Sequence, residues 1–302
     1  MPLLKRLKNC ICPFVFVFAV SMLLGCATRP AVQTDDFLFS LLPHDDLVYL
    51  RFPVEENKEL AFALVHSAYS EMPRKNVERI VKRLGTVYFS MLSDDFCVCA
   101  DGSFPNFALG FVLTKKNGWS KVKSKDIPVT GKYYEHKKSD LQLAFPSSSV
   151  AVAGKSVFPM LSSYADYEAK PSETKAGLFF QCIERENPDT VSFYITNLSA
   201  LLPSFKIANL KLEFPFSDAW GCLYEEKKSK DVVYQLDATL TLSDSRVVRA
   251  AVAALRIASR TLNLPFVVDQ KSDSSIRIHG LYICPDSLGK FISRIFNNYA
   301  EE

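Results

Sequence analysis

Residues 86–100 read Thr-Val-Tyr-Phe-Ser-Met-Leu-Ser-Asp-Asp-Phe-Cys-Val-Cys-Ala. They contain two β-rich apolar runs, 86–92 and 96–100, separated by the turn-forming residues 93–95. A third run, 107–114, follows the Gly- and Pro-containing residues 101–105. Because strands joined by such short turns pair antiparallel, we expect these runs to form neighbouring strands of one sheet.

An amphipathic helix is expected directly before these strands. After Pro73, the apolar residues Val77, Ile80, Val81 and Leu84 recur at the spacing i, i+3, i+4, i+7, while basic and polar residues occupy the other side. The pattern predicts a helix that Gly85 ends and that packs on the sheet.

The rest of the first half alternates short strand and helix patterns. We expect a strand at 47–54, a helix at 58–72, a lysine-rich solvated connector at 115–138, strands at 140–145 and 149–153, and a helix at 158–164.

The second half has a similar pattern. It predicts strands at 190–196, 210–223, 232–242, 266–268 and 275–283, and helices at 245–263 and 285–298. The fold class is therefore α+β, with antiparallel sheets, helices packed on one face, and two similarly built units that resemble a duplication. The predicted organisation is a signal peptide at 1–25, an acylated cysteine and tether at 26–37, a first unit at 38–168, a linker at 169–176 and a second unit at 177–302.

The N-terminus determines where the protein is sent. Lys5, Arg6 and Lys8 precede an apolar run from 11 to 24, which is the layout of a secretory signal peptide. At ~14 residues the run is shorter than the ~20 that a transmembrane helix needs. Two alternatives stay open: a signal peptide whose following cysteine, Cys26, carries no lipid, and a segment that is not cleaved and stays in the membrane as an anchor.

The run ends in Leu23-Leu24-Gly25-Cys26, which resembles the lipobox of bacterial lipoproteins, and its Leu24 is similar to the looser lipobox of spirochaetal lipoproteins. The resemblance covers the first 26 residues and identifies no family for the exported part. It implies that Cys26 is acylated and becomes the N-terminus, so that a membrane is the first partner. Ala27 lacks the aspartate that retains enterobacterial lipoproteins at the inner membrane. The resemblance therefore favours the outer membrane, with the protein facing the periplasm.

Charge and cysteine counts exclude several classes of protein. Loss of Lys5, Arg6 and Lys8 leaves 33 basic and 33 acidic residues, a balance that argues against a nucleic-acid partner. Five cysteines remain after the signal peptide and Cys26 are set aside: Cys97, Cys99, Cys182, Cys222 and Cys284. Their odd number and spacing fit no disulfide framework, so we expect most of them to be small buried residues.

No catalytic constellation stands out. His44, Asp45 and Asp46 offer an imidazole and two carboxylates and are the best candidate for acid–base chemistry, although aspartates also favour a turn before a strand. No motif indicates a cofactor or a metal site.

The sharpest remaining feature is a basic helix face. Between 245 and 263, Arg246, Arg249, Arg256 and Arg260 share one narrow side, and no acid occurs from 245 to 268. Such a face suits anionic lipid, an envelope polymer or an acidic protein. The alternative is a core-packed helix whose arginines bond acids elsewhere in the fold.

These observations favour a membrane-anchored envelope lipoprotein that is not an enzyme and acts as a binding or scaffold module. The alternatives are an envelope hydrolase acting on peptide or glycan at His44, Asp45 and Asp46, and a purely structural interaction protein.

Overall fold

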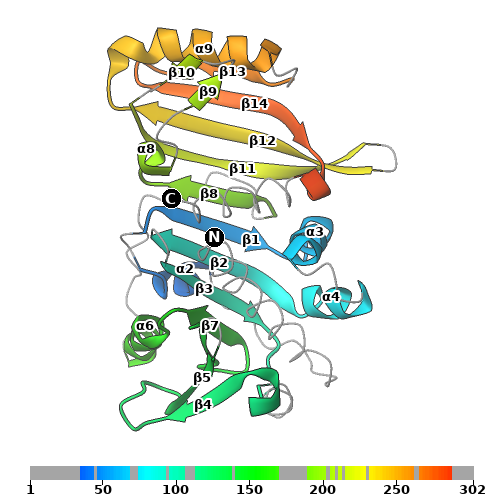
Figure 1. The fold of residues 1–302 in the computed structure, drawn as a ribbon, viewed down its shortest axis with the longest axis vertical. Coiled ribbons are helices and arrows are strands. Elements are labelled where there is room, and N and C mark those ends of the chain that lie inside the picture. Colours follow the sequence, from blue (N-terminus) through cyan, green and yellow to red (C-terminus); the bar gives the residue numbers. More distant parts are fainter. Residues whose placement is uncertain are drawn as a thin grey trace.

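The protein is built around one long antiparallel sheet (Figure 1). The computed structural model describes residues 35–43, 46–68, 74–92, 95–105, 113–137, 140–169, 189–201, 205–207, 210–212, 215–228, 231–261 and 265–287. Twelve strands form the main sheet, and a small two-stranded sheet lies beside it.

The first half of the chain supplies seven strands of the main sheet. Its elements are α2 (Asp35–Ser40), β1 (Val48–Pro53), α3 (Lys58–Ala68), α4 (Arg74–Val81), β2 (Leu84–Leu92), β3 (Asp95–Gly102), η1 (Lys115–Asn117), β4 (Trp119–Lys123), β5 (Lys132–His136), β6 (Gln142–Ala144), β7 (Val150–Gly154) and α6 (Phe158–Ala169).

The second half supplies the other five strands of the main sheet and the small sheet β9–β10. Its elements are β8 (Val191–Ile195), α8 (Leu198–Leu201), β9 (Phe205–Ile207), β10 (Leu210–Leu212), β11 (Phe216–Lys228), β12 (Asp231–Leu242), η2 (Ser245–Val247), α9 (Val248–Thr261), β13 (Val267–Gln270) and β14 (Ser275–Ile283).

The strands of each half are neighbours, so each half forms its own part of the single sheet. The strand order runs β13-β14-β12-β11-β8-β1-β2-β3-β7-β6-β5-β4, so that the halves meet where β1 pairs with β8. The predicted α+β class and antiparallel pairing are confirmed. The division into two units stays a prediction, and all but the first residue of the predicted linker 169–176 lie outside the described part of the chain.

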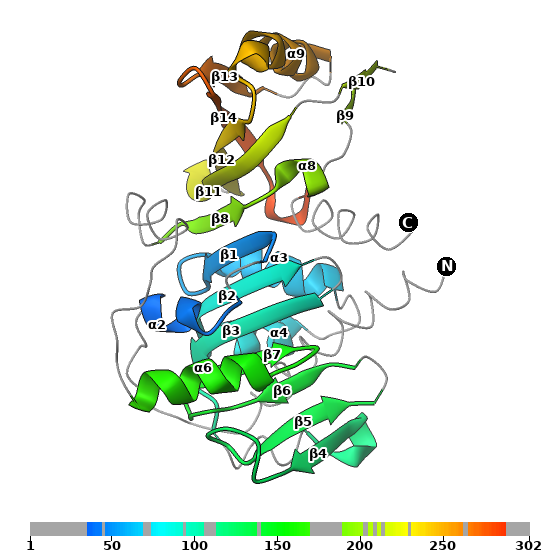
Figure 2. The same cartoon turned by 90° about the vertical axis from the view of Figure 1, so that its left-hand side faces the viewer.

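Helices cover both faces of the sheet, where the prediction placed them on one (Figure 2). On one face α3 and α4 bury a cluster that includes Leu60, Val77 and Trp119. On the other face α2 and α6 bury a cluster that includes Leu38, Tyr88 and Met160. A third cluster lies beneath α9 at the β13 end of the sheet.

Most of the lysine-rich region 115–138 is the β-hairpin of β4 and β5, which spans residues 119–136, so its prediction as a connector was wrong. The apolar side chains on β4 and β5 explain the difference, because Trp119 and Tyr134 are buried in the same core cluster as α3 and α4. Val122 and Tyr133 pack on the opposite cluster. The hairpin therefore has apolar contacts on both faces.

Two predicted boundaries also change. Gly85 lies in β2 and does not end the preceding helix. A Cβ there would come within 2.4 Å of the Asp101 carboxylate, which accepts a hydrogen bond from the Thr86 amide. The tether predicted to reach residue 37 ends earlier, because α2 begins at Asp35 and buries Phe37, Leu38 and Phe39. The predicted strand 107–114 and helix 285–298 lie mostly outside the described residues.

The cysteines behave largely as predicted. Cys97, Cys99 and Cys222 are buried and form no disulfide, Cys284 is exposed, and Cys182 lies outside the described residues. Burial, followed by the charges of Asp46 and Asp95, raises the pKa of Cys97 from 9.0 to about 12. Burial also raises the pKa of Cys99. Both thiols on β3 therefore stay protonated at neutral pH and act as small apolar groups.

Candidate functional site

The helix α9 lies over the β13 end of the sheet (Figure 1). The chain enters it through η2, where the Asp244 side chain accepts a hydrogen bond from the Arg246 amide. The side of α9 that faces the sheet buries Val248, Ala251, Val252 and Ala258. The first three pack in one cluster with Val268 and Ile276. This contact fixes which side of the helix faces solvent.

Arg246 does not belong to the helix face. It lies in η2, and its guanidinium binds the Asp244 carboxylate at 2.8–3.2 Å through Nε and Nη2. This pairing lowers the pKa of Asp244 and raises that of Arg246. The charge of Arg246 is thus balanced by a carboxylate two residues earlier in the chain.

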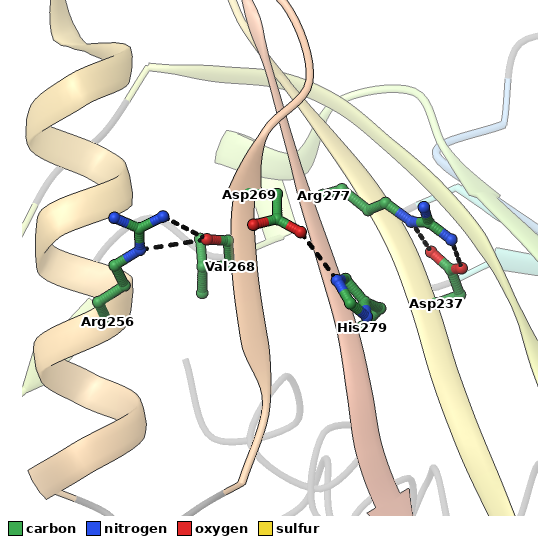
Figure 3. A network of polar contacts seen from close by, with 6 residues as sticks. All are labelled: Asp237, Arg256, Val268, Asp269, Arg277 and His279. Atoms are coloured by element: carbon green, nitrogen blue, oxygen red, sulfur yellow. Dashed lines mark hydrogen bonds and ion pairs between the residues drawn. The ribbon is translucent and has the colours of Figure 1, made fainter.

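Arg256 has a structural contact as well. Its Nε and Nη2 donate hydrogen bonds of 3.1 and 2.9 Å to the carbonyl oxygen of Val268, on the side of β13 that faces away from β14 (Figure 3). Since β13 is the last strand of the sheet, Arg256 occupies an edge carbonyl that would otherwise be open to another strand. The carbonyl carries no net charge, so Arg256 keeps its positive charge.

Arg249 and Arg260 differ from these two. Both are exposed, and neither side chain has an ion-pair or hydrogen-bond partner among the described residues. Ile257, whose side chain is 60% exposed, also lies on the solvent side of α9, about 60° around the helix from Arg260. The spacing from 249 to 256, 257 and 260 places these residues on one side of α9. We call Arg249, Arg256, Ile257 and Arg260 the arginine face.

The nearby acids of the sheet are engaged elsewhere. Strand alternation directs Asp269 to the face opposite α9, because its neighbour Val268 is buried beneath the helix. There Asp269 lies 2.9 Å from His279, and the Asp237 carboxylate accepts hydrogen bonds from Arg277 (Figure 3). These acids therefore do not neutralise the arginine face.

The candidate acid–base cluster cannot be placed, because His44 and Asp45 lie outside the described residues. Asp46 is buried, and its amide donates a hydrogen bond of 2.9 Å to the Tyr49 hydroxyl. Its carbonyl accepts one from Thr196. These contacts fit a turn that anchors β1. The described part of the chain also contains no group of three or more His, Cys, Asp or Glu side chains able to hold a metal ion.

The predicted lipid-attachment residue, Cys26, also lies outside the described residues. No helix in the described part of the chain combines the length and apolar character needed to cross a bilayer.

The sequence interpretation overlooked Ile257. Its position three residues before Arg260 places it on the same side of the helix as that arginine, not among the residues predicted to face the core. The sequence feature that could have identified Ile257 is an apolar residue on the basic side of an amphipathic helix.

The chain is similar to known treponemal proteins. Residues 35–288 match the family model described as outer membrane-associated lipoprotein TP0453. A relative, outer membrane protein TP0453 of Treponema pallidum (strain Nichols), is 27% identical over 154 residues. That alignment covers 50% of this chain and spans about half (52%) of the relative's length.

Solved structures of TP0453 share the fold. Crystal form III matches with a TM-score of 0.63 at 19% identity, covering 87% of this chain and 99% of that chain. Crystal form I matches with a TM-score of 0.61 at 20% identity, covering 87% and 98%.

These matches supply what the sequence interpretation left open, a family for the exported part. The family description confirms the prediction of an envelope lipoprotein, and it confirms the preference for the outer membrane over the inner one. With 35–288 matched, the chain belongs to the family of the outer membrane-associated lipoprotein TP0453.

Proposed function

We propose that this protein is held at the periplasmic side of the outer membrane by lipid on Cys26, and that it acts without catalysis as a membrane-surface module. In this proposal the arginine face of α9 contacts anionic lipid headgroups. The observation that carries it is the exposure of Arg249, Ile257 and Arg260 on one side of a helix, where no acid among the described residues pairs with either arginine.

The anchor rests on the Leu-Leu-Gly-Cys ending of the signal peptide and on the family. A single acyl chain binds a bilayer only marginally, whereas several chains hold a protein firmly. We expect Cys26→Ala to leave an unlipidated precursor. Metabolic labelling with a palmitate analogue tests this, and equal labelling of wild type and variant would disprove attachment at Cys26.

Anionic lipid fits the arginine face better than a soluble polymer does. The guanidinium groups suit phosphate oxygens, and a polymer would satisfy them equally well. Ile257 makes the difference, because an exposed aliphatic side chain gains free energy by entering the boundary between headgroups and acyl chains. An exposed apolar residue beside cations on the same side of a helix therefore favours a bilayer surface.

The experiment uses the chain from residue 26 onward with Cys26→Ser, so that no acyl chain contributes to binding. Flotation with phosphatidylcholine vesicles, with and without phosphatidylglycerol, measures the partition coefficient. Arg249→Glu with Arg260→Glu should weaken binding to anionic vesicles by about 4 kcal/mol, roughly a thousandfold, because two charges are reversed at about 1 kcal/mol per unit charge.

The matched control is Lys271→Glu, which changes the net charge as much as Arg260→Glu does. Lys271 lies over the Trp220 ring, 4.7 Å from its centroid, and Trp220 is on the sheet face opposite α9. We expect Lys271→Glu to retain binding and Arg260→Glu to lose it. Equal losses in the two variants, or a wild type that ignores anionic vesicles at low salt, would refute the proposal.

A further inference from the structure

The hairpin of β4 and β5 lies at the opposite end of the sheet from α9 (Figure 1). In its register Lys123 is directly opposite Lys132, and Lys121 is the next residue on the same face of β4. Like charges that face each other across two strands destabilise the pair. Partial desolvation, followed by repulsion from Lys132 and Lys123, lowers the pKa of Lys121.

No acid relieves this repulsion within the described residues. The Lys121, Lys123 and Lys132 side chains have no ion-pair or hydrogen-bond partner there. The Asp126 carboxylate accepts a hydrogen bond of 3.0 Å from the Ser124 hydroxyl. Glu135 lies on the other face of β5, because strand alternation separates it from Lys132 and Tyr134. The lysines thus form a cationic patch that lacks a counter-charge from the described chain.

The loop that joins the two strands carries a second unusual feature. Val129 has φ of 59°, a conformation that β-branched residues rarely adopt, and its side chain is 44% exposed. The loop is firmly held, since Ile127 is buried and the Thr130 hydroxyl donates to the Lys132 carbonyl at 2.6 Å. A strained backbone therefore presents an apolar side chain to solvent beside the lysines, where Asn or Gly would be the unstrained choice.

We infer that the β4–β5 hairpin is a second membrane contact, in which Val129 enters the headgroup boundary of an anionic bilayer while Lys121, Lys123 and Lys132 bind lipid phosphates. The phosphates supply the counter-charge that the cross-strand lysines lack. The bilayer gives the exposed valine an apolar environment, which neither water nor a soluble polyanion offers. The inference shares the anionic lipid surface with the proposed function but does not depend on the arginine face.

The test uses the same Cys26→Ser chain and the same vesicles. Lys121→Gln with Lys123→Gln removes two cations and should weaken partition onto anionic vesicles about 30-fold. Val129→Asn removes the apolar side chain but tolerates the positive φ. We expect it to weaken vesicle binding while the melting temperature stays equal or rises, so the loss cannot be attributed to unfolding.

Parallel measurements distinguish this inference from the α9 proposal. If Arg249→Glu with Arg260→Glu retains binding while the hairpin variants lose it, the hairpin contact stands and the α9 proposal fails. If the hairpin variants bind vesicles like the wild type, the inference is overturned. It is also overturned if Val129→Asn has no effect and the lysine variant weakens binding to vesicles and to soluble polyphosphate equally.

Discussion

Replacement of Arg256 by alanine tests whether the arginines of α9 divide into structural and free groups. The variant loses two hydrogen bonds, of 3.1 and 2.9 Å, from a charged donor to the Val268 carbonyl. A hydrogen bond to a charged group contributes about 1.5–3 kcal/mol, but these two share one acceptor at a solvent-accessible edge. We therefore expect the free energy of unfolding to fall by about 1–2 kcal/mol, including lost packing of the arginine stem.

Urea unfolding followed by circular dichroism gives this difference directly, and the melting temperature should fall by several degrees. Arg249→Ala is the matched control on the same helix, and we expect a change within about 0.5 kcal/mol because its side chain has no partner among the described residues. Arg256→Lys should lower the free energy of unfolding by an intermediate amount, since one ammonium group replaces a forked guanidinium donor. Equal stability of Arg256→Ala and Arg249→Ala would refute the division.

Two further predictions concern the core and the organisation of the chain. The raised pKa of Cys97, about 12, and that of Cys99 mean that the unfolded chain releases protons above about pH 9 while the folded chain keeps them, so stability should fall as the pH rises above 9. Cys97→Ala with Cys99→Ala should flatten this decline in urea titrations between pH 8 and about 10.5, and an unchanged slope would contradict the assignment. Cleavage after Lys175, in the predicted linker, should leave two fragments that co-elute in gel filtration, because residues 48–51 of β1 pair with 192–195 of β8. Their separation without denaturant would show that this pairing does not hold the halves together.

Local patterns predicted much of the sheet. The alternation of Val233, Gln235, Asp237, Thr239 and Thr241 predicted β12, and its polar face is the one opposite α9. Turn residues at 93–95 predicted the β2–β3 hairpin. Both signals arise between residues that are close in the sequence, so a single sequence contains them.

Features that depend on distant partners were not predicted. The pairing of Val48 with Ile195 unites the two halves in one sheet, and no local pattern specifies it. The hairpin of β4 and β5 was not predicted, because its many lysines were interpreted as a solvated connector although Trp119 and Tyr134 pack in the core. Gly85 was interpreted as a helix end, since the carboxylate of Asp101 that requires a glycine there is 16 residues away in the sequence.

The roles of the residues in the candidate site also depend on partners that are distant in the sequence. Helical spacing placed Arg246, Arg249, Arg256 and Arg260 on one side and gave all four the same role. Asp244 is two residues from Arg246 in the sequence, whereas the Val268 carbonyl contacts Arg256 only because α9 packs on β13. Tertiary contacts therefore decide which cations remain free for a partner.

The most direct measurement of membrane contact is the environment of residue 257 in the lipidated protein. Ile257→Cys, combined with Cys182→Ala and Cys284→Ala, carries an environment-sensitive fluorophore, and Ser272→Cys serves as the control in an exposed turn after β13. We expect a blue shift at 257 on anionic vesicles, a smaller shift on neutral vesicles, and none at 272. An unshifted label at 257, or equal shifts at both positions, would contradict it.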